Sequence, residues 1–154
     1  MAIKISNFFN YQNNNSKIGD FQDLEHIDGV SISATTANLY NIKRDDVVMF
    51  YFRKGASYAS VYTQSKIISE NIKWNQKIKT KKIRAIIINT RNANAFTGVE
   101  GFKSLKVIAE NLAEGLSIKQ KSDEEQPVRI KPNELLFACT CLLYTSDAAD
   151  DPTC

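Results

Sequence analysis

The residues best suited to chemistry lie in one polar stretch, from Asn89 to Gly98 (NTRNANAFTG). Asparagine and glycine tolerate turn and left-handed conformations, and small side chains let a ligand approach the backbone closely. The stretch ends at Thr97 and Gly98, where a helical pattern begins. Backbone N–H groups at a helix start have no intrahelical partner, and the helix dipole favours negative charge there. The sequence therefore predicts a binding site at Thr97 and Gly98, unless Thr97 merely caps the helix.

Histidine and cysteine add little to this chemistry. His26 is the single histidine, in the polar context LEHID, and we expect a surface or loop role for it. Cys139, Cys141 and Cys154 have no second cluster and no nearby histidine, which argues against a zinc site or a disulfide framework. The basic run from Lys77 to Lys82 is typical of a solvated loop before a strand. We predict no metal and no bound cofactor.

A strand must lead into the polar stretch and a helix must follow it. Residues 83–88 carry four isoleucines in six positions, which is typical of a buried interior strand. From Glu100 to Leu116 apolar residues recur on one helical face, and Gly115 stands in a plausible C-cap position. Ser117 to Asn133 is charged and contains two prolines, so it is predicted to be a loop.

Further strands and one further helix complete the predicted domain. We expect a half-buried strand at residues 30–34, a strand buried on both faces at 47–52, a turn at Gly55, an antiparallel partner strand at 59–63, a helix within 65–78 and a short strand at 135–139. Strands that alternate with helices in this way indicate an α/β fold with a layered sheet.

Length and composition indicate one globular domain, or part of one. The chain has 154 residues, 43% of them apolar, and a net charge of +3. No apolar run approaches the roughly 20 residues that cross a membrane, and the first residues do not read as a signal peptide. We expect a cytoplasmic protein with no membrane partner. The small basic excess does not predict a nucleic-acid partner either.

Four segments together resemble the ornithine acetyltransferase / N-acetylglutamate synthase family of arginine biosynthesis. They are GVSISATTANLYNIKRDDVVMF (29–50), ASVYTQSK (59–66), NIKWN (71–75) and INTRNANAFTG (88–98). The last is the most specific, because the family usually reads Asn-Ser/Thr-Gly-Asn-Ala-Asn-Ala there, then one residue and Thr-Gly. Arg91 stands where the family generally has Gly. The resemblance resumes at LLFACT (135–140), which matches the strand before the family's Ser-Thr-Gly-Val-Ile-Gly segment.

The resemblance implies a layered sheet-and-helix domain of the self-cleaving ornithine acetyltransferase / aminopeptidase type, here incomplete. It implies transfer of an acetyl group from N2-acetylornithine to L-glutamate through an acetyl-threonine intermediate, with acetyl-CoA a possible alternative donor. The family's oxyanion hole maps onto Thr97 and Gly98, and a substrate-binding threonine maps onto Thr140. Arg91 is left out of the expected site because it departs from the family pattern.

The resemblance also implies a partner chain. Family members are made as one precursor that cuts itself into an alpha and a beta chain, and two copies of each assemble into a heterotetramer. The nucleophile is the new N-terminal threonine of the beta chain. Residues 29–140 would be a truncated alpha chain after an irregular arm at 1–28, and no residue here is expected to replace the nucleophile. We expect this chain to be inactive on its own.

Residues 141–154 (CLLYTSDAADDPTC) do not continue the resemblance. The expected Gly-Val-Ile-Gly is replaced by a string that looks like translated sequencing-adapter read-through, so we expect a non-native tail that packs poorly. Two other functions stay open: a non-catalytic α/β domain that binds a small molecule or a protein, and a related self-cleaving aminopeptidase. The NANAFTG run favours the acetyltransferase.

Overall fold

The computed structural model describes residues 27–39, 45–90 and 92–139. These residues form a four-stranded sheet in the order β1-β2-β3-β4, with helices on it. The elements are β1 (Val30–Thr35), β2 (Val47–Ser57), α1 (Glu70–Lys77), β3 (Lys82–Asn89), α2 (Gly98–Asp123), a 3-10 helix (Pro132–Glu134) and β4 (Leu135–Cys139). β2 is antiparallel to both β1 and β3, whereas β4 runs parallel to β3. The α/β class predicted from the sequence is confirmed.

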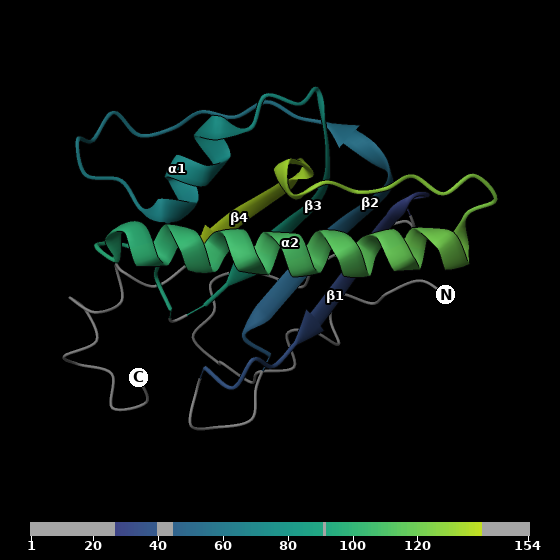
Figure 1. Cartoon of the computed structure of the whole chain (residues 1–154), viewed down its shortest axis with the longest axis horizontal. Coiled ribbons are helices and arrows are strands. Elements are labelled where there is room, and N and C mark those ends of the chain that lie inside the picture. Colours follow the sequence, from purple (N-terminus) through teal and green to yellow (C-terminus); the bar gives the residue numbers. More distant parts are fainter. Residues whose placement is uncertain (1–26, 40–44, 91, 140–154) are drawn as a thin grey trace, which may run out of the picture.

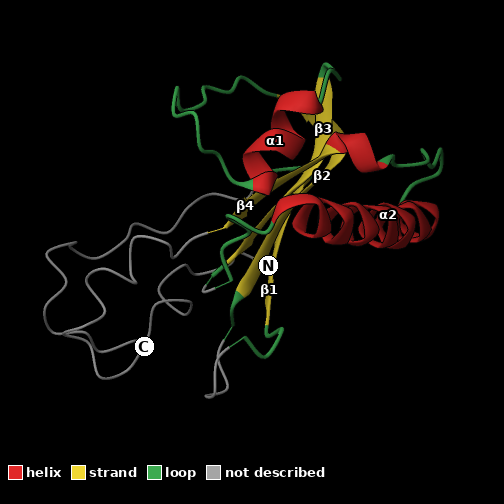
Figure 2. Ribbon diagram, turned by 60° about the vertical axis from the view of Figure 1, so that its left-hand side comes forward, coloured by secondary structure: helices red, strands yellow, loops and turns green. Residues whose placement is uncertain are grey.

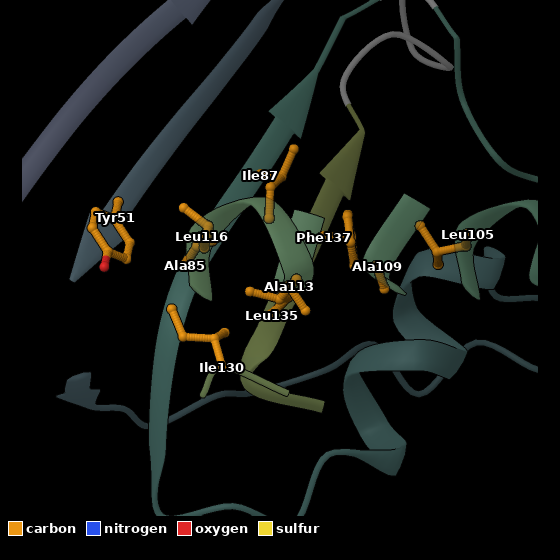
Figure 3. Packing of buried hydrophobic residues seen from close by; sticks show 10 residues of the cluster. All are labelled: Tyr51, Ala85, Ile87, Leu105, Ala109, Ala113, Leu116, Ile130, Leu135 and Phe137. Carbon is orange, nitrogen blue, oxygen red and sulfur yellow. The ribbon is translucent and has the colours of Figure 1, made fainter. Parts of the chain in front are cut away.

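The core lies between the sheet and α2, which runs across the strands (Figures 1 and 2). Alternation along β3 directs Ile83, Ala85 and Ile87 to one face, where all three are buried. Ala109 and Ala113 of α2 are buried too, and their small side chains let the helix lie close to the strands. Figure 3 shows the cluster that results, which consists of Tyr51, Ala85, Ile87, Leu105, Ala109, Ala113, Leu116, Ile130, Leu135 and Phe137. The interior strand predicted at 83–88 is confirmed.

α1 covers the outer edge of β4 with side chains rather than with a further strand. Asn75 Nδ2 donates to the Phe137 carbonyl at 2.9 Å, and the Phe137 N–H donates back to Asn75 Oδ1 at 3.0 Å. Trp74 Nε1 donates to the Leu135 carbonyl at 3.0 Å. These bonds satisfy backbone groups that an open sheet edge would leave unpaired. The segment NIKWN, noted above for its resemblance, therefore holds the edge of the sheet.

α1 itself is shorter than the predicted range of 65–78. Ser69 is its N-cap, with a side-chain oxygen that accepts the Ile72 N–H at 3.4 Å. No helix in the described ranges is both long and apolar enough to cross a membrane. The predicted arm at 1–28 falls almost entirely outside the described residues, which begin at Ile27.

The predicted strand at 59–63 is wrong. β1 and β3 already occupy both edges of β2, so no edge remains for a hairpin partner, and Val61 is 98% exposed. Gly55 does not turn the chain but lies inside β2 at φ +73°, where the register with β3 shifts. A bulge of this kind bends a strand without ending it. β2 is also less buried than predicted, because Tyr51 is buried while most of its neighbours are half-buried.

The predicted end of the second helix is also wrong, because α2 continues past Gly115 to Asp123. Leu116 and Gln120 lie on the buried side of the added turns. Gln120 Nε2 donates to Tyr51 Oη at 2.6 Å and to the Arg53 carbonyl at 2.8 Å. These contacts outweigh the roughly 1 kcal/mol that a helical glycine costs relative to alanine. Much of the charged run after residue 116 is therefore helix surface rather than loop.

Candidate functional site

A cavity of about 680 Å³ lies between the sheet, the loop after β3 and the N-terminal half of α2. One end is polar and is lined by Asn71, Asn89, Asn94 and Thr97. The remaining wall is largely apolar and comes from the sheet and from α2; it includes Met49, Ile87, Leu105, Ile108, Leu112 and Phe137. An apolar cavity with a few convergent polar groups is the usual form of a small-molecule site.

Thr97 and Gly98 stand at the point where the loop enters α2. The helix begins at Gly98, as predicted, and both residues are exposed. Gly98 has φ +59°, a left-handed conformation that strains any residue with a β-carbon, and Phe96 accepts φ +58° two positions earlier. Strain of this kind costs about 1–3 kcal/mol per residue and collects at functional sites. The first N–H groups of α2 lack intrahelical acceptors and are available to a ligand.

The Thr97 side chain does not cap the helix. Its backbone occupies the N-cap position, but the side chain makes no capping hydrogen bond. The hydroxyl instead donates to Asn94 Oδ1, three residues earlier. Thr97 is therefore the N-cap residue by position, as the alternative interpretation has it, but its hydroxyl is directed toward the loop and not toward the helix.

Asn94 links the loop to both helices. Its Nδ2 donates to the Gly101 carbonyl at 3.1 Å and to Asn71 Oδ1 at 3.4 Å, and its own carbonyl accepts the Glu70 N–H at 2.9 Å. Gly101 must be glycine here, because a β-carbon would overlap the Thr97 and Asn94 side chains. The loop therefore packs directly against the first turn of α2.

Sequence reasoning missed Asn71 and Cys139, although both line the cavity. Asn71 is 4% exposed, and its Nδ2 donates to Cys139 Sγ at 2.6 Å. The Cys139 thiol donates to Asn89 Oδ1 at 2.9 Å, and Asn89 Nδ2 donates to the Asn92 carbonyl at 2.9 Å. The signal that could have pointed to them is the family resemblance, because Asn71 lies in the segment NIKWN and Cys139 in the segment LLFACT.

Asp46 supports another wall of the cavity. Its side chain is buried, and its two carboxylate oxygens accept the N–H groups of Ala37 at 2.5 Å and Leu39 at 2.8 Å. Its own carbonyl accepts the Thr90 N–H at 2.9 Å, next to the Asn-rich loop. A carboxylate that accepts backbone N–H bonds in this way is stable when buried.

The cavity offers little charge. Glu100 is the charged residue among its described lining, and it pairs with Lys103 at 2.7 Å on the exposed surface. Within the described ranges no group of three His, Cys, Asp or Glu side chains could hold a metal ion. Binding here would depend on amide, hydroxyl and backbone groups.

Several predicted residues lie outside the described ranges, namely His26, Arg91, Thr140, Cys141 and Cys154. The placement of Thr140 in the same cleft as Gly98 stays a prediction. Cys139, the residue before it, ends β4 and lines the cavity.

Comparison with known proteins gives one consistent family. The ArgJ family model matches residues 31–126. The arginine biosynthesis bifunctional proteins ArgJ of Zymomonas mobilis and Bradyrhizobium diazoefficiens are each 34% identical to the chain, over 95 and 99 residues. These matches cover 61% and 64% of this chain but 23% and 24% of the relatives. The ArgJ of Bartonella henselae is 32% identical over 121 residues, which is 78% of this chain and 28% of that protein.

Solved structures agree with the sequence matches. Ornithine acetyltransferase from Mycobacterium tuberculosis, solved with ornithine, aligns with a TM-score of 0.62 over 75% of this chain and 57% of that one. The ArgJ structure from Bacillus halodurans aligns with a TM-score of 0.57 over 73% and 53%. Sequence identity is 23% in both cases, so these two comparisons concern the fold. The chain spans about a quarter of the length of the curated relatives it matches.

Proposed function

The chain belongs to the ArgJ family, and from this membership we propose that it supplies the oxyanion-binding part of an acetyltransferase of arginine biosynthesis. The reaction moves an acetyl group from N2-acetylornithine to L-glutamate, with acetyl-CoA as a possible second donor. The nucleophile is a threonine of a second chain from the same precursor. Two copies of each chain form the assembly. The cytoplasm, where thiols such as Cys139 stay reduced, is the proposed compartment.

The chemistry divides one difficult transfer into two steps. The threonine oxygen attacks the carbonyl carbon of the N-acetyl group, the C–N bond breaks, and ornithine leaves with a proton on its amine. The glutamate amine then attacks the acetyl-threonine ester and releases the threonine hydroxyl. Each step passes through a tetrahedral intermediate whose oxygen carries negative charge. Thr97 Oγ1 and the Gly98 N–H are the proposed donors to that oxygen, and Thr140 is proposed to bind the substrate.

One observation carries this proposal: an exposed threonine and a left-handed glycine stand at the start of a 26-residue helix, where the preceding loop lines a cavity. Donor atoms whose positions are fixed in advance at a helix start can stabilise charge with little rearrangement during the reaction. A Thr-Gly pair that only starts a helix would explain neither the hydrogen bond from the Thr97 hydroxyl to Asn94 nor the left-handed backbone of Phe96. Membership in the ArgJ family favours this function over an aminopeptidase.

The test is acetyl transfer from N2-acetylornithine to glutamate by the purified chain, alone and after mixing with the second chain of a full-length relative. We expect turnover only in the mixture. Thr97→Ala should lower kcat by about 100- to 1000-fold, the usual effect of removing one oxyanion donor. Thr80→Ala is the matched control, because Thr80 lies in the loop between α1 and β3 and donates to the Lys82 carbonyl there.

Two outcomes would contradict the proposal. Turnover by the chain alone would show that the nucleophile is not in a second chain. An active mixture in which Thr97→Ala behaves like Thr80→Ala would show that Thr97 is not an oxyanion donor. Release of free amino acids from peptide substrates by the mixture would favour the aminopeptidase instead.

A further inference from the structure

We propose that Asn94 positions the Thr97 hydroxyl, and that Asn71 and Cys139 hold Asn94 in place through further hydrogen bonds on its side away from Thr97. The catalytic consequence rests on the proposed function, whereas the positioning can be measured in the chain by itself. A single series of hydrogen bonds carries the inference. It runs from Thr97 through Asn94, Asn71, Cys139 and Asn89 to the Asn92 carbonyl.

The orientation of the Asn94 amide is set by the Gly101 carbonyl. A carbonyl oxygen can only accept, so the Asn94 NH₂ group must face it, at 3.1 Å. Asn94 Oδ1 therefore faces Thr97 and receives the hydroxyl proton. Reversing the amide would place two oxygens against each other at Gly101. The Thr97 rotamer is thus fixed by a group that has one allowed orientation.

Asn71 and Cys139 form a second support behind Asn94. Asn71 Oδ1 accepts from Asn94 Nδ2 at 3.4 Å, the longest bond of the series, so this support is weaker than that of Gly101. The Asn71 amide is oriented in turn because its Nδ2 donates to Cys139 Sγ at 2.6 Å. The Cys139 thiol has its own acceptor in Asn89 Oδ1. Burial of Asn71 excludes water from competing for these bonds.

This arrangement lets the Thr97 hydroxyl donate to a charged reacting oxygen in preference to a neutral substrate carbonyl. At rest the hydroxyl proton is held by a neutral amide oxygen. A neutral substrate carbonyl is no better an acceptor than that oxygen, whereas hydrogen bonds to a charged acceptor are about twice as strong. The hydroxyl proton should therefore turn from Asn94 Oδ1 to the reacting oxygen as negative charge develops, while the Thr97 oxygen itself stays in place. An interaction that strengthens only in the transition state raises kcat rather than tightening substrate binding.

The positioning is tested by NMR on the full chain. Three-bond couplings from the Thr97 methyl carbon to its backbone nitrogen and carbonyl carbon report the χ1 rotamer. We expect a single rotamer in the wild type and averaged couplings in Asn94→Ala. Asn92→Ala is the matched control in the same loop, because Asn92 enters the series through its backbone carbonyl. Averaged couplings in the wild type would overturn the proposal without any variant, and so would unchanged couplings in Asn94→Ala.

Cys139 is tested with two substitutions of similar size. Cys139→Ser keeps one donor and one acceptor, whereas Cys139→Ala removes both. We expect the serine variant to retain the single Thr97 rotamer and the alanine variant to lose part of it. Identical couplings in the two variants would remove Cys139 from the proposal.

A double-mutant cycle connects positioning to catalysis in the mixture with a relative's second chain. If Asn94 acts through Thr97, Asn94→Ala should lower kcat by about 10- to 100-fold without raising KM. In the Thr97→Ala background the same substitution should not lower kcat any further. Equal losses in both backgrounds would overturn the role of Asn94. If Thr97→Ala itself has no effect, the proposed function fails, while the couplings still decide the positioning.

Discussion

Two glycines of α2 are expected to respond in opposite ways when a β-carbon is added. Gly98 has φ +59° with open space around it, whereas Gly115 lies in the middle of the helix, also with open space. Gly98→Ala should therefore destabilise the chain by about 1 kcal/mol through backbone strain, and Gly115→Ala should stabilise it by about 0.5–1 kcal/mol. Urea unfolding of both variants measures the two values. The same sign for both would show that φ at Gly98 does not matter.

The chemistry of individual residues could be predicted only in part. Thr97 and Gly98 follow from a local pattern, because the loop and the helix start are contiguous. Asn71 and Cys139 are 68 residues apart, and nothing in either segment indicates that they meet. Their contact depends on α1 lying along the edge of β4, which is a property of the whole sheet.

The last turns of α2 depend on Gln120. Its side chain is 2% exposed and reaches both Tyr51 and the Arg53 carbonyl. Gln120→Ala should destabilise the chain by about 1–3 kcal/mol, because the Tyr51 hydroxyl and the Arg53 carbonyl lose a buried donor. Lys121→Ala, at an exposed neighbouring position, should change stability by less than about 0.5 kcal/mol. Hydrogen exchange should show faster opening of the helix end in Gln120→Ala; equal exchange in the two variants would contradict this role.

The edge of β4 depends on Asn75. Asn75→Ala leaves the Phe137 N–H and carbonyl without their partners and should cost about 2 kcal/mol, whereas Gln76→Ala, on the exposed side of the same helix, should be nearly neutral. The opened edge could then pair with another chain, so Asn75→Ala should also show a larger hydrodynamic size at high concentration. A variant as stable and as small as Gln76→Ala would show that α1 does not close this edge.

Elements with strong local patterns were predicted well, and elements decided by distant contacts were not. The bounds of β4 and the start of α2 agree with the sequence, because period and turn residues are local signals. The strand expected at 59–63 has the right composition but no free edge to join. The end of α2 was missed because a buried glutamine, which reads as a surface residue, extends it.

For the whole molecule, the segment 141–154 is predicted to contribute nothing to the fold. The contacts described above connect residues 30–139, and the match to the ArgJ family model ends before this segment. Deleting 141–154 should leave the melting temperature unchanged within experimental error. A clear decrease would show that the segment is structural.

The hydrogen bonds from α1 to the edge of β4 also set an order of events during folding. The hydrogen-bond partners of Trp74 and Asn75 lie 61 and 62 residues further along the chain, so these bonds form only when β4 reaches the sheet. The antiparallel strands β1, β2 and β3 are joined by shorter connections and can pair first, since loop-closure entropy grows with separation. β4 then docks late, and the bond between Asn71 and Cys139 closes with it. Asn75→Ala should accordingly speed unfolding and leave the refolding rate almost unchanged, so that the polar end of the cavity is the last part of the molecule to assemble.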